Sequence, residues 1–67
     1  MNIDIRESIK NNFKNSSTKE IKESITESLK DKEEITLPGL GVFFEILWEY
    51  SNDSEKEKIL ESLKKGL

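Results

Sequence analysis

Apolar residues recur at every fourth position near the start of the chain, where Ile5, Ile9 and Phe13 form a narrow stripe. This spacing places the three side chains on one side of a helix. Either Asn2 or Asp4 is suited to cap its first turn. A run of asparagine and serine residues then interrupts the pattern, because such side chains compete for backbone hydrogen bonds. The pattern therefore predicts one amphipathic helix followed by a turn.

A second helix is expected from residue 18 to about residue 32. Ser17 and Glu20 stand three positions apart at its start, which matches a capping box. In that arrangement the hydroxyl and the carboxylate each accept a hydrogen bond from a backbone amide at the helix start. The apolar stripe of this helix consists of Ile21, Ile25 and Leu29.

The chain changes character at residues 35–37, which we predict to be a short extended segment. A residue that precedes proline is pushed toward extended geometry, and Leu37 precedes Pro38. Proline suits the first position of a helix, where its missing amide hydrogen costs nothing. Gly39 and Gly41 allow close approaches that a side chain would block. A third helix is therefore expected to begin near residues 38–40 and to end at about residue 50.

This third helix is apolar around most of its circumference. Glu45 and Glu49 mark a narrow polar edge, and the apolar arc spans roughly 200°. Because one-sided packing requires about half that width, the helix needs neighbours on more than one side. The other helices can supply them, and so can a second copy of the chain. Phe43, Leu47 and Tyr50 lie opposite the polar edge, with Phe44, Ile46 and Trp48 on the flanks.

Two expectations follow for the aromatic residues of this arc. Trp48 and Tyr50 are more typical of a core than of a surface on which bases stack. With a second copy as the neighbour, the expected complex is a homodimer through the helix at residues 38–50. Its expected interaction surface consists of Phe44, Ile46 and Trp48.

A fourth helix completes the predicted fold. Asn52 and Glu55 form a second capping-box pattern at its start, and Gly66 is suited to end it. The apolar residues of this helix are Ile59, Leu60, Leu63 and Leu67. The sequence thus predicts a single all-α domain over residues 1–67, a small four-helix domain with a central hydrophobic third helix.

Composition excludes several classes of function. The chain has no Cys and no His, which rules out disulfides and thiolate or imidazole sites for metals or catalysis. Its 11 basic and 14 acidic residues are mixed, and a net charge of −3 disfavours nucleic-acid binding. No segment approaches the ~20 apolar residues of a membrane span, and the first residues lack the layout of a secretion signal. We therefore expect a soluble intracellular protein that is not an enzyme and binds no cofactor. The partner is not identified by the sequence.

A dozen residues in the middle of the chain form a distinctive motif, Leu37-Pro-Gly-Leu-Gly-Val-Phe-Phe-Glu-Ile-Leu-Trp48. An acidic pair, Glu33 and Glu34, precedes it, and an Asn-Asp-x-Glu-Lys helix start follows it. This pattern resembles the small acid-soluble spore protein I family, the minor I-type spore proteins of Bacillus and Clostridium relatives. The resemblance extends over nearly the whole chain. The motif residues are Leu37, Pro38, Gly39, Leu40, Gly41, Phe43, Phe44, Glu45, Leu47 and Trp48.

The resemblance implies a non-enzymatic protein that is made in the forespore during sporulation and found in the spore core. It implies a location in the forespore cytoplasm. The chain lacks the Glu-x-Ala-Ser-Glu protease site of the major DNA-saturating spore proteins, so their DNA-coating role is not carried over. The family motif has no assigned chemistry, which leaves the molecular role undefined. The alternative from the residues alone is a small helical module for self-association or protein interaction.

A second resemblance concerns the segment Lys-x-x-Glu-Glu-Ile-Thr-Leu-x-Gly-Leu-Gly-x-Phe. It is similar to part of the histone-like bacterial DNA-binding proteins, in which a Gly-x-Gly turn joins two strands. This alternative predicts two helices and a β-hairpin that pairs residues 35–37 with residues 42–46. The apolar residues at 43–48 do not alternate as in a half-buried strand, and the chain lacks a long basic arm. These observations favour the all-α prediction.

Overall fold

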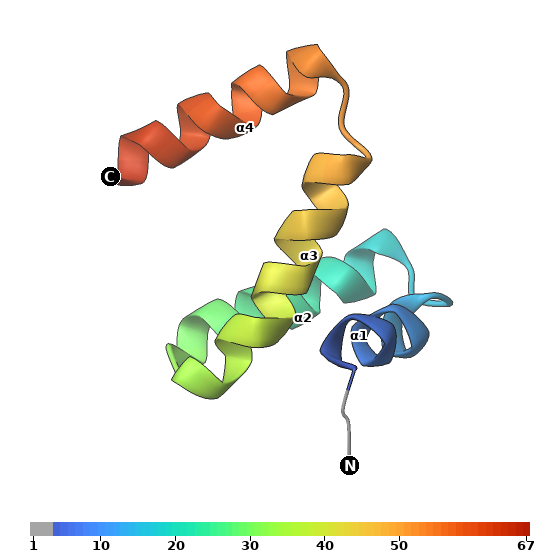
Figure 1. The fold of residues 1–67 in the computed structure, drawn as a ribbon. Helices are drawn as coiled ribbons and strands as arrows, with labels where there is room; N and C mark the ends of the chain where they lie inside the picture. The colour runs from blue at the N-terminus through green and yellow to red at the C-terminus, as the bar shows by residue number, and fades with distance from the viewer. Residues whose placement is uncertain (1–3) are drawn as a thin grey trace.

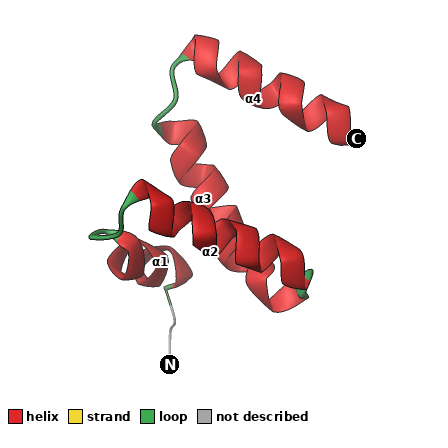
Figure 2. Ribbon diagram, turned by 180° about the vertical axis from the view of Figure 1, so that it is seen from behind, coloured by secondary structure: helices red, strands yellow, loops and turns green. Residues whose placement is uncertain are grey.

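The computed structural model describes residues 4–67, and its elements are all helical (Figure 1). No strand occurs in the described range (Figure 2), so the all-α prediction is confirmed and the β-hairpin alternative is wrong. The elements are α1 (Ile5–Phe13), α2 (Thr18–Asp31), the 3₁₀ helix η1 (Glu34–Thr36), α3 (Leu37–Glu49) and α4 (Asp53–Gly66).

Both predicted capping boxes are present. The Glu20 amide donates to Ser17 Oγ at 3.2 Å, and the Ser17 amide donates to Glu20 Oε1 at 3.3 Å. At the start of α4, the Glu55 amide donates to Asn52 Oδ1 at 2.8 Å and the Asn52 amide donates to Glu55 Oε1 at 2.9 Å. These bonds satisfy amides that have no partner inside the helix. They explain why α2 and α4 begin at the positions that the sequence indicates.

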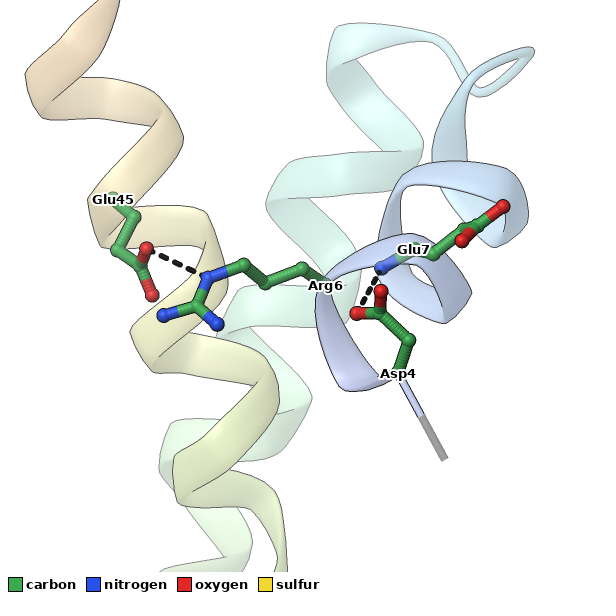
Figure 3. Close-up of polar contacts among 4 residues, drawn as sticks. All are labelled: Asp4, Arg6, Glu7 and Glu45. Atoms are coloured by element: carbon green, nitrogen blue, oxygen red, sulfur yellow. Dashed lines mark hydrogen bonds and ion pairs between the residues drawn. The ribbon is translucent and has the colours of Figure 1, made fainter. Parts of the chain in front are cut away.

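The start of α1 is capped by Asp4, one of the two predicted candidates. Its Oδ1 accepts a hydrogen bond of 3.1 Å from the Glu7 amide (Figure 3). The other candidate, Asn2, lies outside the described residues. At the end of α2, Lys32 adopts a left-handed conformation with φ 51°, and this conformation stops the helix.

The segment before α3 differs from its prediction, because Leu37 is helical, with φ −60° and ψ −42°. The Leu37 amide donates to the Glu34 carbonyl, and Thr36 Oγ1 donates to the Glu33 carbonyl at 2.8 Å. These bonds form a 3₁₀ turn that continues directly into α3. Proline disfavours helical geometry in the preceding residue without forbidding it. The prediction of an extended segment at residues 35–37 was therefore wrong, and Pro38 occupies the second helical position.

The core lies where the first half of α3 approaches α1. Gly39 brings the two helices close together, because a Cβ at this position would lie 3.3 Å from Ile9 Cδ1. Val42 follows three positions later on the same side of α3, and it exposes only 5% of its surface. It is the one buried side chain among residues 4–67. The packed centre of this fold is therefore very small.

Aromatic contact extends this junction toward the end of α1. The rings of Phe13 and Phe43 meet edge to face, with centroids 5.0 Å apart and an interplanar angle of 74°. Both side chains are half-buried. The predicted stripe of α1 therefore does face α3.

Three other apolar predictions need correction. Leu29 exposes 58% of its surface, because α2 instead turns Ser24 and Ser28 toward the packed side, where both line a hollow with residues of α1 and α3. Tyr50 is almost fully exposed at the end of α3, and Trp48 is only half-buried. Neither aromatic residue lies in a core. The second half of α3 extends beyond α1 and α2 (Figure 1), and Tyr50 borders the groove between these helices without being covered by them.

The two helical glycines of the motif allow a matched prediction. A methyl group added at Gly41 would meet no atom within 4 Å, so Gly41→Ala is expected to raise the free energy of unfolding by ~0.5–1 kcal/mol. Gly39→Ala should raise the free energy of unfolding by a smaller amount, since Ile9 Cδ1 must move to admit the methyl group. Chemical denaturation followed by circular dichroism measures both values. A larger gain for Gly39→Ala than for Gly41→Ala would contradict the close approach of α1.

Candidate interaction surface on helices α3 and α4

The motif residues do not converge on one site, because they surround α3. Gly39 and Phe43 face α1, whereas Leu37 is exposed. Glu45 forms an ion pair with α1, described below. Leu40 lines hollows on the side of α1 and α2, and the remaining large residues of the motif line hollows shared with α4. Those residues are Phe44, Leu47 and Trp48.

Helices α3 and α4 form an open V, with α4 at the end of α3 that is far from α1 and α2 (Figures 1 and 2). Apolar side chains from both helices line hollows inside this V. Trp48 and Ile59 among them are half-buried, and each of the others exposes between 41% and 48% of its surface. We call this set the α3–α4 face. It consists of Phe44, Leu47, Trp48, Ile59, Leu60 and Leu63.

Helical spacing explains why these residues share one surface. Phe44, Leu47 and Trp48 are three and four positions apart, and Leu60 and Leu63 are three apart, so each set occupies one side of its helix. The short connection through Ser51 then directs the two sides toward each other. Ser51 Oγ donates to the Leu47 carbonyl, which closes the end of α3.

An aromatic pair forms the inner end of the α3–α4 face. The rings of Phe44 and Trp48 stack with centroids 6.1 Å apart and an interplanar angle of 27°. Lys56 of α4 places its Nζ 5.1 Å from the centre of the Trp48 ring. A cation at this distance is attracted by the negative face of the indole. This contact joins the first turn of α4 to the end of α3.

The contact between Lys56 and Trp48 gives a direct prediction. Lys56→Gln should lower the free energy of unfolding by ~0.5–1 kcal/mol, because the cation over the indole is lost. Lys58→Gln is the matched control, since it removes the same charge from the same helix. Thermal and chemical unfolding at a fixed protein concentration compare the two variants. Equal losses would show that charge alone, and not the indole, accounts for the effect.

Ile46 does not line the hollows that Phe44 and Trp48 share with α4. It is two positions from both Phe44 and Trp48, so it occupies a different side of α3. It borders an apolar groove of about 790 Å³ between α1, α2 and α3, which Phe44 and Leu47 also line. Phe44 and Trp48 lie on the same side of α3, and Leu60 and Leu63 of α4 line the same hollows. The sequence marks these two leucines as apolar, but it does not show that they face α3.

An exposed ion pair joins the other edge of α3 to α1. Arg6 Nε donates to Glu45 Oε2 at 2.9 Å (Figure 3). This hydrogen bond and the negative charge of Glu45 raise the pKa of Arg6. The pair links residues 39 positions apart in the chain. It bridges α1 and α3, and Glu45 also lines a hollow beside Phe44, Trp48 and Leu60.

Two further observations concern chemistry and membranes. Within residues 4–67, no group of three or more acidic side chains is arranged to hold a metal ion. None of the helices in this range combines the length and apolar character that a membrane crossing requires.

Comparison with known proteins finds relatives along the whole chain. The family model described as small, acid-soluble spore protein I matches residues 3–67. A protein of that name from Bacillus licheniformis is 36% identical over 67 residues, which cover 100% of this chain and 96% of the relative. Another from Halalkalibacterium halodurans is also 36% identical, with 100% and 98% coverage. No solved structure gives a significant match. This chain therefore belongs to the small, acid-soluble spore protein I family.

Proposed function

We propose that this protein is a non-enzymatic component of the spore that acts through contacts of its α3–α4 face. In this proposal it is made in the forespore during sporulation and stays in the spore core. The names of the relatives support the spore setting, since each is called a small, acid-soluble spore protein. The proposed mode of action is binding between helices.

The position of the family motif supports the proposed mode of action. Phe44, Leu47 and Trp48 belong to the motif and also form the α3 side of an exposed apolar surface. Large apolar residues that gather on one exposed surface mark sites of protein interaction. An interaction surface thus accounts for residues that the small core does not use.

The spore setting is tested in the organism that encodes the protein. Antibodies against the purified chain are applied to extracts of growing cells, sporulating cells and dormant spores. We expect the protein only after sporulation begins, and we expect dilute acid to extract it from broken spores. Equal amounts in growing cells would contradict this part of the proposal, and so would recovery only from the outer spore layers.

The mode of action is tested separately by photo-crosslinking. A photoreactive amino acid at Leu63 lies on the α3–α4 face, whereas the same group at Leu29 is exposed on α2. We expect crosslinked products in spores from position 63 and far fewer from position 29. Equal yields at the two positions would argue against a dedicated surface.

A further inference from the structure

We propose that the partner of the α3–α4 face is a second copy of this chain. Two copies pair about a two-fold axis, and α4 of each copy lies antiparallel beside α4 of the other. Each α4 thereby fills the V between α3 and α4 of the second copy, and four helices enclose one shared core. This inference rests on the proposed role of the face in binding, and it is independent of the spore setting.

The chain exposes more surface than a compact monomer of the same mass. A compact monomer of 7.8 kDa exposes about 4,400 Å². This chain exposes 6084 Å², which exceeds that value by about 1,700 Å². Each partner in a stable interface buries ~800 Å², and more in obligate homodimers. The surplus is about twice the standard value, so it falls in the range that each partner buries in an obligate homodimer.

The dimensions of the chain support the same conclusion. Its radius of gyration is 13.1 Å. A compact domain of 67 residues has a radius of gyration of ~11 Å. With Val42 as the one buried side chain in the described range, the separate chain has little core to hold α4 in place. A domain this small commonly gains its missing core by oligomerisation.

The charges of α4 favour an antiparallel pair of identical helices. The first turn of α4 carries Asp53 and Glu55, and its last turn carries Lys64 and Lys65. In an antiparallel pair, the first turn of each helix lies beside the last turn of the other, so opposite charges meet at both ends. A parallel pair would place like charges together. The charge pattern of α4 is therefore complementary to that of a second, antiparallel α4.

The middle of α4 fits a two-fold axis. The midpoint of Asp53–Gly66 falls between Ile59 and Leu60, where two apolar side chains from each copy would meet. Glu57 and Lys64 are seven positions apart, so they lie on the same flank of the apolar stripe. Antiparallel pairing about this midpoint brings Glu57 of one copy next to Lys64 of the other. Each dimer contains two such contacts.

Sedimentation equilibrium of the full chain tests the dimer. We expect a mass twice the 7.8 kDa of one chain, and a melting temperature that rises with protein concentration. Leu60→Glu and Leu63→Glu should sediment as monomers. Leu29→Glu, which places the same charge on exposed α2, should remain dimeric. A monomeric wild-type chain up to millimolar concentration would overturn the proposal, as would a dimer that survives both α4 substitutions.

A charge exchange tests the arrangement without disturbing apolar packing. In Glu57→Lys alone, or in Lys64→Glu alone, both contacts become repulsive, and we expect the dissociation constant to rise about tenfold. An equimolar mixture of the two variants should form a heterodimer with nearly wild-type affinity, because opposite charges face each other again. Failure of the mixture to associate more tightly than either variant would overturn the antiparallel arrangement.

The outcomes separate this inference from the proposed function. A monomeric wild-type chain that still crosslinks from position 63 in spores would assign the α3–α4 face to a different protein and overturn the homodimer alone. A dimer in solution together with equal amounts of protein in growing cells would support the homodimer and contradict the spore setting.

Discussion

Replacing Val42 by alanine is expected to lower the free energy of unfolding by about 2 kcal/mol. The substitution removes two buried carbon atoms, each worth ~0.8 kcal/mol, and leaves a cavity that the helices fill only in part. The higher helix propensity of alanine offsets up to ~0.5 kcal/mol of this loss. A domain of this size has a total stability of ~3–5 kcal/mol. Val42→Ala should therefore populate the unfolded state measurably at room temperature.

The matched control is Ile35→Ala, which removes more carbon atoms from a position that is 82% exposed. Its effect should stay within ~0.5 kcal/mol, because exposed substitutions change little. Urea denaturation followed by circular dichroism at one protein concentration compares the two variants. If the smaller truncation at Val42 costs no more than the larger one at Ile35, the core does not lie on this side of α3.

Local interactions explain why the helices could be predicted from the sequence. The starts of α2 and α4 depend on Ser17 with Glu20 and on Asn52 with Glu55, and each pair is only three positions apart. Their hydrogen bonds form within the first helical turn, so no distant residue is needed. The wrong prediction at Leu37 also involves only residues that are close together in the sequence. Pro38 disfavours helical geometry at Leu37, but the 3₁₀ turn that includes Thr36 outweighs this preference.

Packing explains what could not be predicted. The third helix is apolar on most sides, and its sequence does not state which side faces α1. Val42 therefore received no role in the sequence interpretation. Gly39, three positions earlier, is the signal that identifies this side, because it admits Ile9. Leu29 shows the converse, since its regular spacing predicts a buried stripe while the rotation of α2 leaves it exposed.

The interaction surface was only partly predictable for the same reason. Phe44 and Trp48 are four positions apart on α3, so their proximity follows from helical geometry. Leu60 and Leu63 join them only because α4 returns toward α3 after the turn at Ser51. The orientation of one helix relative to another depends on contacts between distant residues, which a projection of each helix alone omits.

The contact between Phe13 and Phe43 provides the second large expected effect. Phe43→Ala should lower the free energy of unfolding by about 2 kcal/mol, less than the ~3–5 kcal/mol of a fully buried phenylalanine because the ring is half-buried. Phe13→Ala should have a similar effect, since the same junction between α1 and α3 is lost. Chemical denaturation of both variants measures these values.

The double variant distinguishes the ring contact from simple loss of apolar area. With centroids 5.0 Å apart at 74°, the two rings should show a coupling energy of ~0.5–1.5 kcal/mol, so the double loss falls short of the sum of the single losses. Phe44 supplies the control, because it stacks on Trp48 and not on Phe13. Phe13→Ala and Phe44→Ala should therefore be additive within ~0.5 kcal/mol. Additivity in the first pair would place Phe13 away from α3, and α1 would then be held to α3 by Gly39, Val42 and the Arg6–Glu45 ion pair alone.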